Sequence, residues 1–441
     1  AAATRYCEVF WMPRARPDDP PMAREDPIGT PSSAAPERRR TLASLSSRNY
    51  RLFFFGQTVS QVGNWLTMVA LTLLILRRTD SGLAVGALSA CQFGPVLLLS
   101  AWAGVVADRS NKRNLLLITQ SLAMCESFAL GALAFMDEAP LLAFYGVAVV
   151  GGLLLAMDNP VRRYYVIEMV PLEDVSNAVS LYSAMNSLAR ILGPTLAGVL
   201  IVSVGYGWAF TIDAISYVAV ISSLVLMRPA ELRPAPVTPR GAGQVRAGLR
   251  YIGSVPELWI TFSMLLVIGI LSYNYSVVLP LFVVKGLNGS DGAYTLLYSA
   301  FSAGGLIGAL IVARLHTVTP RTVGTNAAAL GVGLIVLSAA PNVPVAVVIA
   351  VFVGGTSIAY MTATTAIAQL RTDRQMLGRV LAVQMVLLIG TTPIGGPILG
   401  MLADAVGARA PVVIGGLGAL AAAAFGLIAS TRLIAADNAS A

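Results

Sequence analysis

The stretch Gly104-Val-Val-Ala-Asp-Arg-Ser-Asn-Lys-Arg113 stands between two apolar runs, residues 82–106 and 115–136. Each run is long enough to cross a bilayer as a helix. The stretch itself holds one acid and three bases, which enter hydrocarbon only at a high free-energy cost. It therefore predicts a short charged turn between two membrane spans.

The composition extends this prediction to the whole chain. Hydrophobic residues make up 56% of the sequence and charged residues 12%, whereas soluble domains carry about 25% charged residues. The net charge of +8 is spread over short loops between apolar runs, a distribution that favours membrane topology over nucleic-acid binding. We therefore expect an all-α integral membrane protein that binds no nucleic acid.

Apolar runs of about 20 residues, the length of a membrane-spanning helix, recur along the sequence. They predict twelve transmembrane helices, at 52–76, 82–106, 115–136, 141–157, 178–204, 208–227, 258–284, 294–313, 323–340, 343–369, 379–403 and 411–429. Lys and Arg are concentrated in alternate loops, and the other loops hold only Arg77, Arg78, Lys285 and Arg409. By the positive-inside rule, both termini are expected in the cytoplasm.

The predicted spans form two six-helix halves, at 52–227 and 258–431. They are separated by a cytoplasmic linker at 228–257 that includes a predicted surface helix around 244–253. The halves echo each other, since Gly193–Gly198 resembles Gly396–Gly400, and duplicated bundles are typical of secondary transporters. The remaining segments are predicted to be a disordered cytoplasmic tail at 1–37, a basic amphipathic segment at 38–51 and a cytoplasmic tail at 432–441.

Ionisable residues inside the predicted spans are candidates for function, because a charge in mid-membrane costs on the order of a few kcal/mol. Glu126 lies near the middle of the third span, where desolvation favours a neutral carboxyl group until water reaches it. Arg190, in the fifth span, keeps its proton and so needs an acid, carbonyl groups or an anionic substrate. Asp213, in the sixth span, is a second candidate proton carrier, or else a structural hydrogen-bond acceptor. A permanent Glu126–Arg190 pair is an alternative to a coupling site.

Polar and aromatic side chains on two other spans are candidate walls of a substrate cavity. Gln57, Gln61 and Asn64 share one face of the first span, and Tyr273 and Asn274 form a cluster in the seventh. Amide and aromatic groups suit an amphipathic ligand. The alternative is that these residues only pack helices together.

Sites of enzymatic chemistry are not expected. The sequence has no phosphate-binding glycine loop, nucleophile triad or metal-ligand cluster, and its three cysteines are far apart. We expect no cofactor, with a proton gradient as the driving force.

The six-plus-six layout and the charged turn at Gly104–Arg113 resemble the major facilitator superfamily. Four pieces are similar to its bacterial branch of enterobactin exporters and transmembrane secretion effectors: Asn49–Phe53, Asp158–Arg162, Asn177–Leu181 with Arg190–Pro194, and Phe210–Ser216. The resemblance implies proton-coupled export, by alternating access, of small amphipathic molecules such as drugs or siderophores. It also implies a monomer in the bacterial inner membrane. The alternatives are a proton- or ion-driven importer, and a non-pumping lipid translocator or membrane scaffold.

The resemblance also assigns roles to particular residues. It implies a cytoplasmic latch made of Gly104, Asp108, Arg109, Lys112 and Arg113, with Asp108 facing the start of the eleventh span near 377–380. A carboxylate there is stabilised by unpaired amides and the helix dipole. The alternative is a turn that is charged only to fix topology.

Two further implications concern the first and fifth spans. Gly193 and Pro194 resemble a fifth-span hinge of exporters, where Gly permits close helix contact and Pro bends the helix. A simple packing kink is the alternative. The position of Asn64 is often acidic in this branch, so its neutrality here weakens any proton-carrying role for the first span.

Overall fold

The computed structural model describes residues 42–233, 244–314 and 318–440. Side chains are not described at 100–102, 104–105, 107–109, 244–245 and 434–440. Over the described ranges the chain is helical, with no strand, and twelve of its helical segments are long and apolar enough to cross a membrane. The predicted number of spans is therefore confirmed, while the predicted tail at 1–37 lies outside the described residues.

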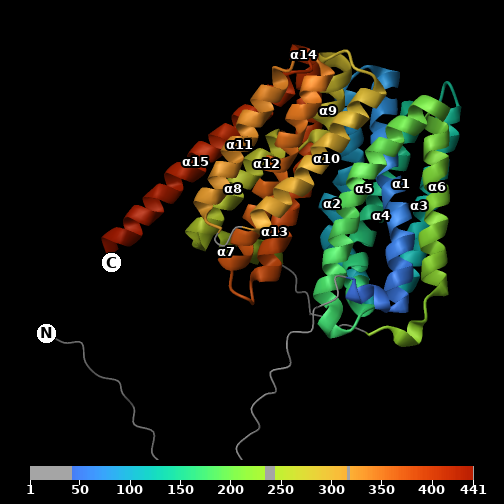
Figure 1. The fold of residues 1–441 in the computed structure, drawn as a ribbon, viewed down its shortest axis with the longest axis horizontal. Coiled ribbons are helices and arrows are strands. Elements are labelled where there is room, and N and C mark those ends of the chain that lie inside the picture. Colours follow the sequence, from blue (N-terminus) through green and yellow to red (C-terminus); the bar gives the residue numbers. More distant parts are fainter. Residues whose placement is uncertain (1–41, 234–243, 315–317, 441) are drawn as a thin grey trace, which may run out of the picture. The chain divides into compact units, whose positions relative to one another are not determined.

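The first half consists of six long helices (Figure 1). They are α1 (Arg48–Thr79), α2 (Gly82–Arg109), α3 (Lys112–Phe135), α4 (Leu141–Glu168), α5 (Val175–Val204) and α6 (Tyr206–Leu226). Short 3-10 turns occur at Ala43–Ser46, Leu172–Asp174 and Pro229–Glu231. In the linker, α7 (Gln244–Ser254) confirms the predicted short helix.

The second half also contributes six spans, but two of them are interrupted. The seventh span consists of α8 (Pro256–Leu271), α9 (Tyr275–Leu281) and the π-helical turn Phe282–Gly286. The eleventh consists of α13 (Leu377–Ile389) and α14 (Thr392–Val406). The other four are α10 (Asp291–Ala313), α11 (Pro320–Ser338), α12 (Val343–Leu370) and α15 (Ala410–Ser440).

Three predicted boundaries were wrong. The seventh and eleventh spans were expected to be continuous, and the fourth was expected to end at Met157, before Pro160. In the structure α4 runs through Pro160 to Glu168, because neighbouring helices can compensate a proline inside a membrane helix. The basic amphipathic segment was predicted at 38–51, before the first span, whereas α1 begins at Arg48 and Tyr50 is fully buried.

The charged turn between the second and third spans is short because α3 begins almost at once. Helix α2 ends at Arg109, and the Asn111 side chain accepts a hydrogen bond from the backbone N–H of Asn114 at 3.2 Å. This is an N-cap, which satisfies an otherwise unpaired amide of the new helix. The turn thus reverses the chain within two residues, 110–111.

Helix α1 begins and α15 ends on the same side of the bundle (Figure 1). We call this side the terminal face and the other side the opposite face. Between the halves, α2 packs on α14 and α5 packs on α10. Helices α2 and α14 belong to the second and eleventh spans, and α5 and α10 are the fifth and eighth. When each span is matched with its counterpart six places away in the other half, the first pair becomes the second, as expected for a duplicated bundle.

Glycines allow the α2–α14 contact to be close. A Cβ atom on Gly86 would collide with the backbone of Gly396 and Pro397, and one on Gly400 would collide with the carbonyl of Gly82. A Cβ atom on Gly396 would likewise collide with the Ser89 hydroxyl of α2. Small residues at such positions let membrane helices approach each other's backbones.

Candidate functional site

A buried ion pair lies on one face of α4. Asp158 and Arg162, one helical turn apart, form a salt bridge, and their side chains are both 6% exposed. Asp158 also accepts hydrogen bonds from the Thr119 hydroxyl at 3.0 Å and the Gln120 amide at 2.8 Å. Arg162 donates to Gln61 Oε1 at 2.9 Å. This network therefore joins α1, α3 and α4.

Sequence reasoning missed Arg162 because the predicted fourth span ended before it. The predicted span ends at residue 157, yet Arg162 is buried within α4. The spacing of four between Asp158 and Arg162 was a usable signal, since oppositely charged residues at this spacing meet on one helical face.

A second polar cluster surrounds Asp213, which is completely buried. Its carboxylate accepts hydrogen bonds from Thr67 at 2.6 Å, Ser127 at 2.8 Å and Ser216 at 3.3 Å. The hydroxyls come from α1, α3 and α6 itself, so the predicted role of structural hydrogen-bond acceptor agrees with this geometry.

Glu126 lies beside this cluster. It precedes Ser127 on α3, faces Gly151 of α4, and is within electrostatic range of Asp213. No hydrogen-bond donor reaches its carboxyl group among the side chains that the structure describes. The structure thus brings the two acids Glu126 and Asp213 together.

Arg190 lies elsewhere, at the junction of α5 with α1 and α10. Its guanidinium carbon is 4.9 Å from the centre of the Trp65 ring, and that ring is 6.4 Å from the ring of Tyr298. Over the described ranges, Arg190 forms no ion pair. Glu126 and Arg190 were predicted to lie together, as a coupling site or a permanent pair. The structure instead places Arg190 against Trp65, and the two described residues form no ion pair.

The stacking on Trp65 stabilises the Arg190 charge only in part. A guanidinium near the middle of a membrane span costs about 2.5–3.5 kcal/mol on insertion scales. A cation–π contact contributes about 0.5–2 kcal/mol. The rest of this free-energy cost has to be offset by water, by carbonyl groups or by a bound anion.

The predicted fifth-span hinge lies one turn further along α5. A Cβ atom on Gly193 would collide with Trp65 of α1 and its neighbouring backbone, so Gly193 is a point of close helix contact. Helix α5 runs without interruption through Pro194. Hinge motion at these residues stays a prediction.

The candidate cavity residues divide into two groups. Gln57 is buried and donates to Gln61 at 3.3 Å, so both belong to the Arg162 network, while Asn64 is half-buried. Asn274 is completely buried and donates to the carbonyl groups of Gly269 at 3.3 Å and Ile270 at 2.7 Å. These carbonyls lie where the seventh span is interrupted, so Asn274 compensates the break.

Tyr273 also bonds within the second half. Its hydroxyl donates to the Ser357 carbonyl of α12 at 2.7 Å. For Tyr273 and Asn274 the geometry thus favours the helix-packing alternative over a cavity wall.

The predicted latch is described only in part. The side chains of Gly104, Asp108 and Arg109 lie outside the described residues. Lys112 forms a salt bridge with Glu168 of α4 at 2.7 Å, and Arg113 donates to the carbonyl groups of Leu224 at 2.8 Å and Val225 at 3.1 Å on α6. These two bases therefore contact their own half.

A carboxylate clamp that the sequence did not predict joins the halves at the opposite face. Asp404, near the end of α14, accepts hydrogen bonds from the Ser81 hydroxyl at 2.9 Å and from the amides of Gly82 at 2.7 Å and Leu83 at 3.0 Å. These amides begin α2 and lack partners within the helix. The carboxylate thus caps a helix of the other half, where the helix dipole favours it.

A second clamp lies at the start of α10. Asp291 forms a salt bridge with Arg77 of α1 at 2.8 Å and accepts a hydrogen bond from the Tyr206 hydroxyl of α6 at 2.6 Å. Lys285 adds longer ion pairs to Asp80 at 3.3 Å and to Asp404 at 3.7 Å. Both clamps would have been hard to find from the sequence, because their members are far apart along it.

Among the side chains that the structure describes, the hydrogen bonds and ion pairs between the halves lie toward the opposite face. Beyond the two clamps, Ser299 of α10 bonds the Thr195 hydroxyl at 2.8 Å and the Ile191 carbonyl at 3.2 Å on α5. In the part of the chain that the structure describes, no hydrogen bond or ion pair joins the halves between this point and the terminal face.

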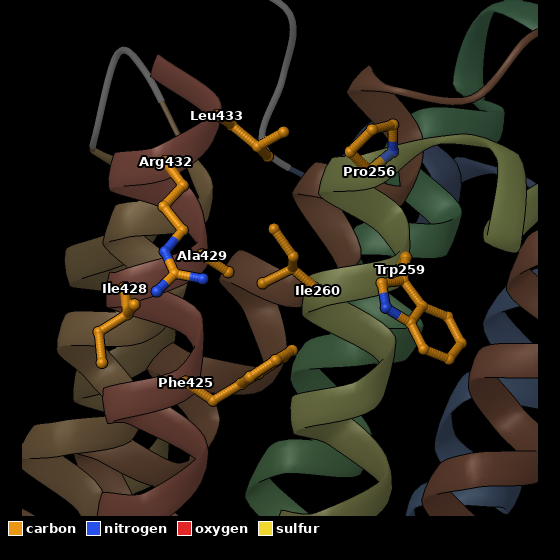
Figure 2. A pocket seen from close by; sticks show the side chains of 8 residues that line it. All are labelled: Pro256, Trp259, Ile260, Phe425, Ile428, Ala429, Arg432 and Leu433. Carbon is orange, nitrogen blue, oxygen red and sulfur yellow. The ribbon is translucent and has the colours of Figure 1, made fainter. Parts of the chain in front are cut away.

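A crevice lies away from these groups, between α8 and α15 (Figure 2). It measures about 380 Å³ and is lined by Pro256, Trp259, Ile260, Phe425, Ile428, Ala429, Arg432 and Leu433. Trp259, Phe425 and Ile428 are exposed. Its apolar lining is that of a lipid-facing surface groove rather than a polar transport site.

Comparison with known proteins gives a consistent picture. A family model described as transmembrane secretion effector matches residues 39–441. The multidrug efflux pump Tap of Mycolicibacterium fortuitum is 26% identical over 372 residues, covering 81% of this chain and 90% of that pump. The staphyloferrin A transporter of Staphylococcus aureus is 25% identical over 269 residues, covering 60% of this chain and 67% of that transporter.

Solved structures agree in fold. A bacterial homologue of the human lysosomal transporter Spinster, in an inward-facing and unoccupied conformation, superposes with a TM-score of 0.70 at 15% identity, covering 87% of this chain and 97% of that chain. A D-xylose–proton symporter gives a TM-score of 0.64 at 14% identity, covering 85% and 97%.

Proposed function

Because this chain belongs to the transmembrane secretion effector family of the major facilitator superfamily, we propose that it exports small amphipathic molecules in exchange for protons. The protein is a multi-pass bacterial membrane transporter, not an enzyme. Its relatives include a multidrug efflux pump and a staphyloferrin A transporter, which favours export over import. We place it in the inner membrane with the basic terminal face in the cytoplasm, acting as a monomer.

The observation that carries this proposal is the one-sided connection between the halves. The Asp404 and Asp291 clamps tie the halves together at the opposite face, and among the described side chains the last hydrogen bond between the halves runs from Ser299 to the Ile191 carbonyl. Alternating access requires a state in which one side is closed while the other can open. We interpret the structure as the state in which the outer side is closed and substrate enters from the cytoplasm.

Glu126 is the proposed proton carrier. It lies within the membrane-spanning part of α3 and, over the described ranges, no donor holds its carboxyl group, whereas Asp213 is held by three hydroxyls. A carboxyl group without fixed partners can change its protonation as access to water changes. Asp213 then serves as the structural neighbour.

The test of this assignment is Glu126→Gln in cells loaded with fluorescent amphipathic dyes. Wild-type protein should lower dye accumulation, a protonophore should abolish this effect, and Glu126→Gln should reduce the initial export rate at least about tenfold. Glu138→Gln, at an exposed loop position, is the control. Export that persists both with the protonophore and in Glu126→Gln would overturn proton antiport.

The charged turn at Gly104–Arg113 is proposed to close the terminal face in the other state. There Asp108 would cap the start of α13, as Asp404 caps the start of α2 at the opposite face. Asp108→Asn should therefore lower transport without lowering the amount of protein inserted in the membrane. Equal transport by wild type and variant, at equal expression, would show that Asp108 does not act as a latch.

A further inference from the structure

We propose that Arg190 makes the transport site selective for amphipathic organic anions, such as carboxylates and sulfonates, over cations. The proposal rests on the proposed export function and narrows its substrate class. It starts from the position of Arg190, a permanently charged group near the middle of a membrane span that has no anionic partner among the described residues.

Arg190 lies where a substrate entering from the terminal face would meet the closed side. It comes one residue before Ile191, at the last hydrogen bond that joins α5 to α10. Trp65 of α1 covers the guanidinium, and Tyr298 of α10 lies against Trp65. The site is therefore built from both halves, which is where duplicated transporters bind their substrates.

The acids of the neighbouring helices are already engaged elsewhere. Asp158 is paired with Arg162, and Asp213 accepts three hydroxyl hydrogen bonds. Glu126 lies among α3, α4 and α6, next to Gly151 and Asp213. Among the described residues, none of these acids forms a hydrogen bond or ion pair with Arg190, so in a cavity open to the cytoplasm its N–H donors are available to water or to the anionic group of a substrate.

The chemistry of the guanidinium matches such a substrate. The guanidinium carbon lies over the Trp65 ring, 4.9 Å from its centre, and the N–H donors of a guanidinium lie in the plane of the group. Two parallel donors bind the two oxygens of a carboxylate, sulfonate or phosphate group. The half-buried Trp65 ring offers an apolar surface for the rest of the molecule. A cation would instead be repelled by Arg190.

The experiment measures binding to the purified full-length protein in detergent, with two dyes that share a xanthene ring. Carboxyfluorescein is the anion and tetramethylrhodamine ethyl ester is the cation. Wild-type protein should bind the anion at least about tenfold more tightly, and Arg190→Gln should weaken anion binding about 10- to 100-fold while leaving cation binding unchanged. Arg190→Lys, which keeps the charge, should retain part of the preference.

The control is Arg314→Gln, an exposed arginine at the end of α10, which should behave as wild type. The proposal is overturned if the wild type binds the cation as tightly as the anion, binds neither dye, or keeps its anion affinity in Arg190→Gln. The binding result does not depend on whether the protein transports the dyes. Anion binding without export would contradict the proposed function alone, and export of both dyes unaffected by Arg190→Gln would contradict the anion assignment alone.

Discussion

Asp213 shows how a buried carboxylate can hold membrane helices together. It accepts hydrogen bonds from Thr67 on α1 and Ser127 on α3, as well as from Ser216 on its own helix. Hydrogen bonds to a charged group contribute about 1.5–3 kcal/mol each, roughly twice the contribution of neutral ones. The Asp213 carboxylate therefore links α1, α3 and α6 of the first half.

Asp213→Asn should lower the stability of the protein. The Asn amide keeps one oxygen acceptor but replaces the other with an N–H donor. A hydroxyl that donated to the lost oxygen then has no acceptor, at a cost of about 1–3 kcal/mol. The expected result is an apparent melting temperature several degrees lower in detergent, measured at one scan rate because unfolding of such proteins is often irreversible. Asp137→Asn, at an exposed loop position, is the control. Equal melting of Asp213→Asn and wild type would show that the network contributes little.

At this scale the sequence predicted which charged groups lie within the membrane but not their partners. Glu126, Arg190 and Asp213 all lie in spanning helices. The partners of Asp213 come from positions 67 and 127, which no local pattern connects with position 213. Trp65 likewise reaches Arg190 only through the packing of α1 against α5.

Helices α2 and α14 form the closest connection at the opposite face. Glycines on both helices bring the backbones together, and Asp404 of α14 reaches the first amides of α2. A carboxylate at a helix N-terminus contributes about 0.3–2 kcal/mol, depending on its burial. Such a contribution is large enough to bias the equilibrium between the state open at the terminal face and the state open at the opposite face.

Asp404→Asn should shift that equilibrium toward opening of the opposite face. Loss of the charge removes about 0.5–2 kcal/mol from the closed state, which corresponds to a change of about 2- to 30-fold in the population ratio. The measurement is the distance distribution between spin labels at Glu138 and Pro341, two exposed positions on that face, with the three native cysteines replaced.

The control for this shift is Asp80→Asn. The Asp80 side chain is 81% exposed and 3.3 Å from Lys285, and exposed ion pairs contribute little. A longer-distance population that grows in Asp404→Asn but not in Asp80→Asn would support the clamp. An unchanged distribution in both would contradict it.

At the scale of helices, the number of spans was predictable but the interruptions were not. Hydropathy is a local property, so the apolar run at 258–284 was sufficient to predict a span. The break at 272–274 depends on Asn274, whose amide bonds the carbonyls of Gly269 and Ile270. A polar residue within a span can either compensate a break or line a cavity, and only its surroundings distinguish the two. The extension of α4 through Pro160 has the same non-local cause.

On the scale of the whole molecule, the division into two halves was predictable, but the conformational state, that is, which face is closed, was not. Linker position, repeated glycine motifs and loop charge all indicated a six-plus-six bundle. Which face is closed depends on bonds such as those of Asp291 with Arg77 and Tyr206. These residues are far apart in sequence and each looks like an ordinary flank of a span.

At the same scale, we propose that a proton gradient drives export across this bundle. The most direct test of this proposal uses everted membrane vesicles, in which the cytoplasmic face points outward, with the interior made acidic and dyes of both charges added outside. The account predicts dye accumulation that requires the protein, stops on addition of a protonophore, and is lost in Glu126→Gln. Accumulation that ignores the pH gradient, or that occurs only in right-side-out vesicles with an acidic exterior, would contradict it.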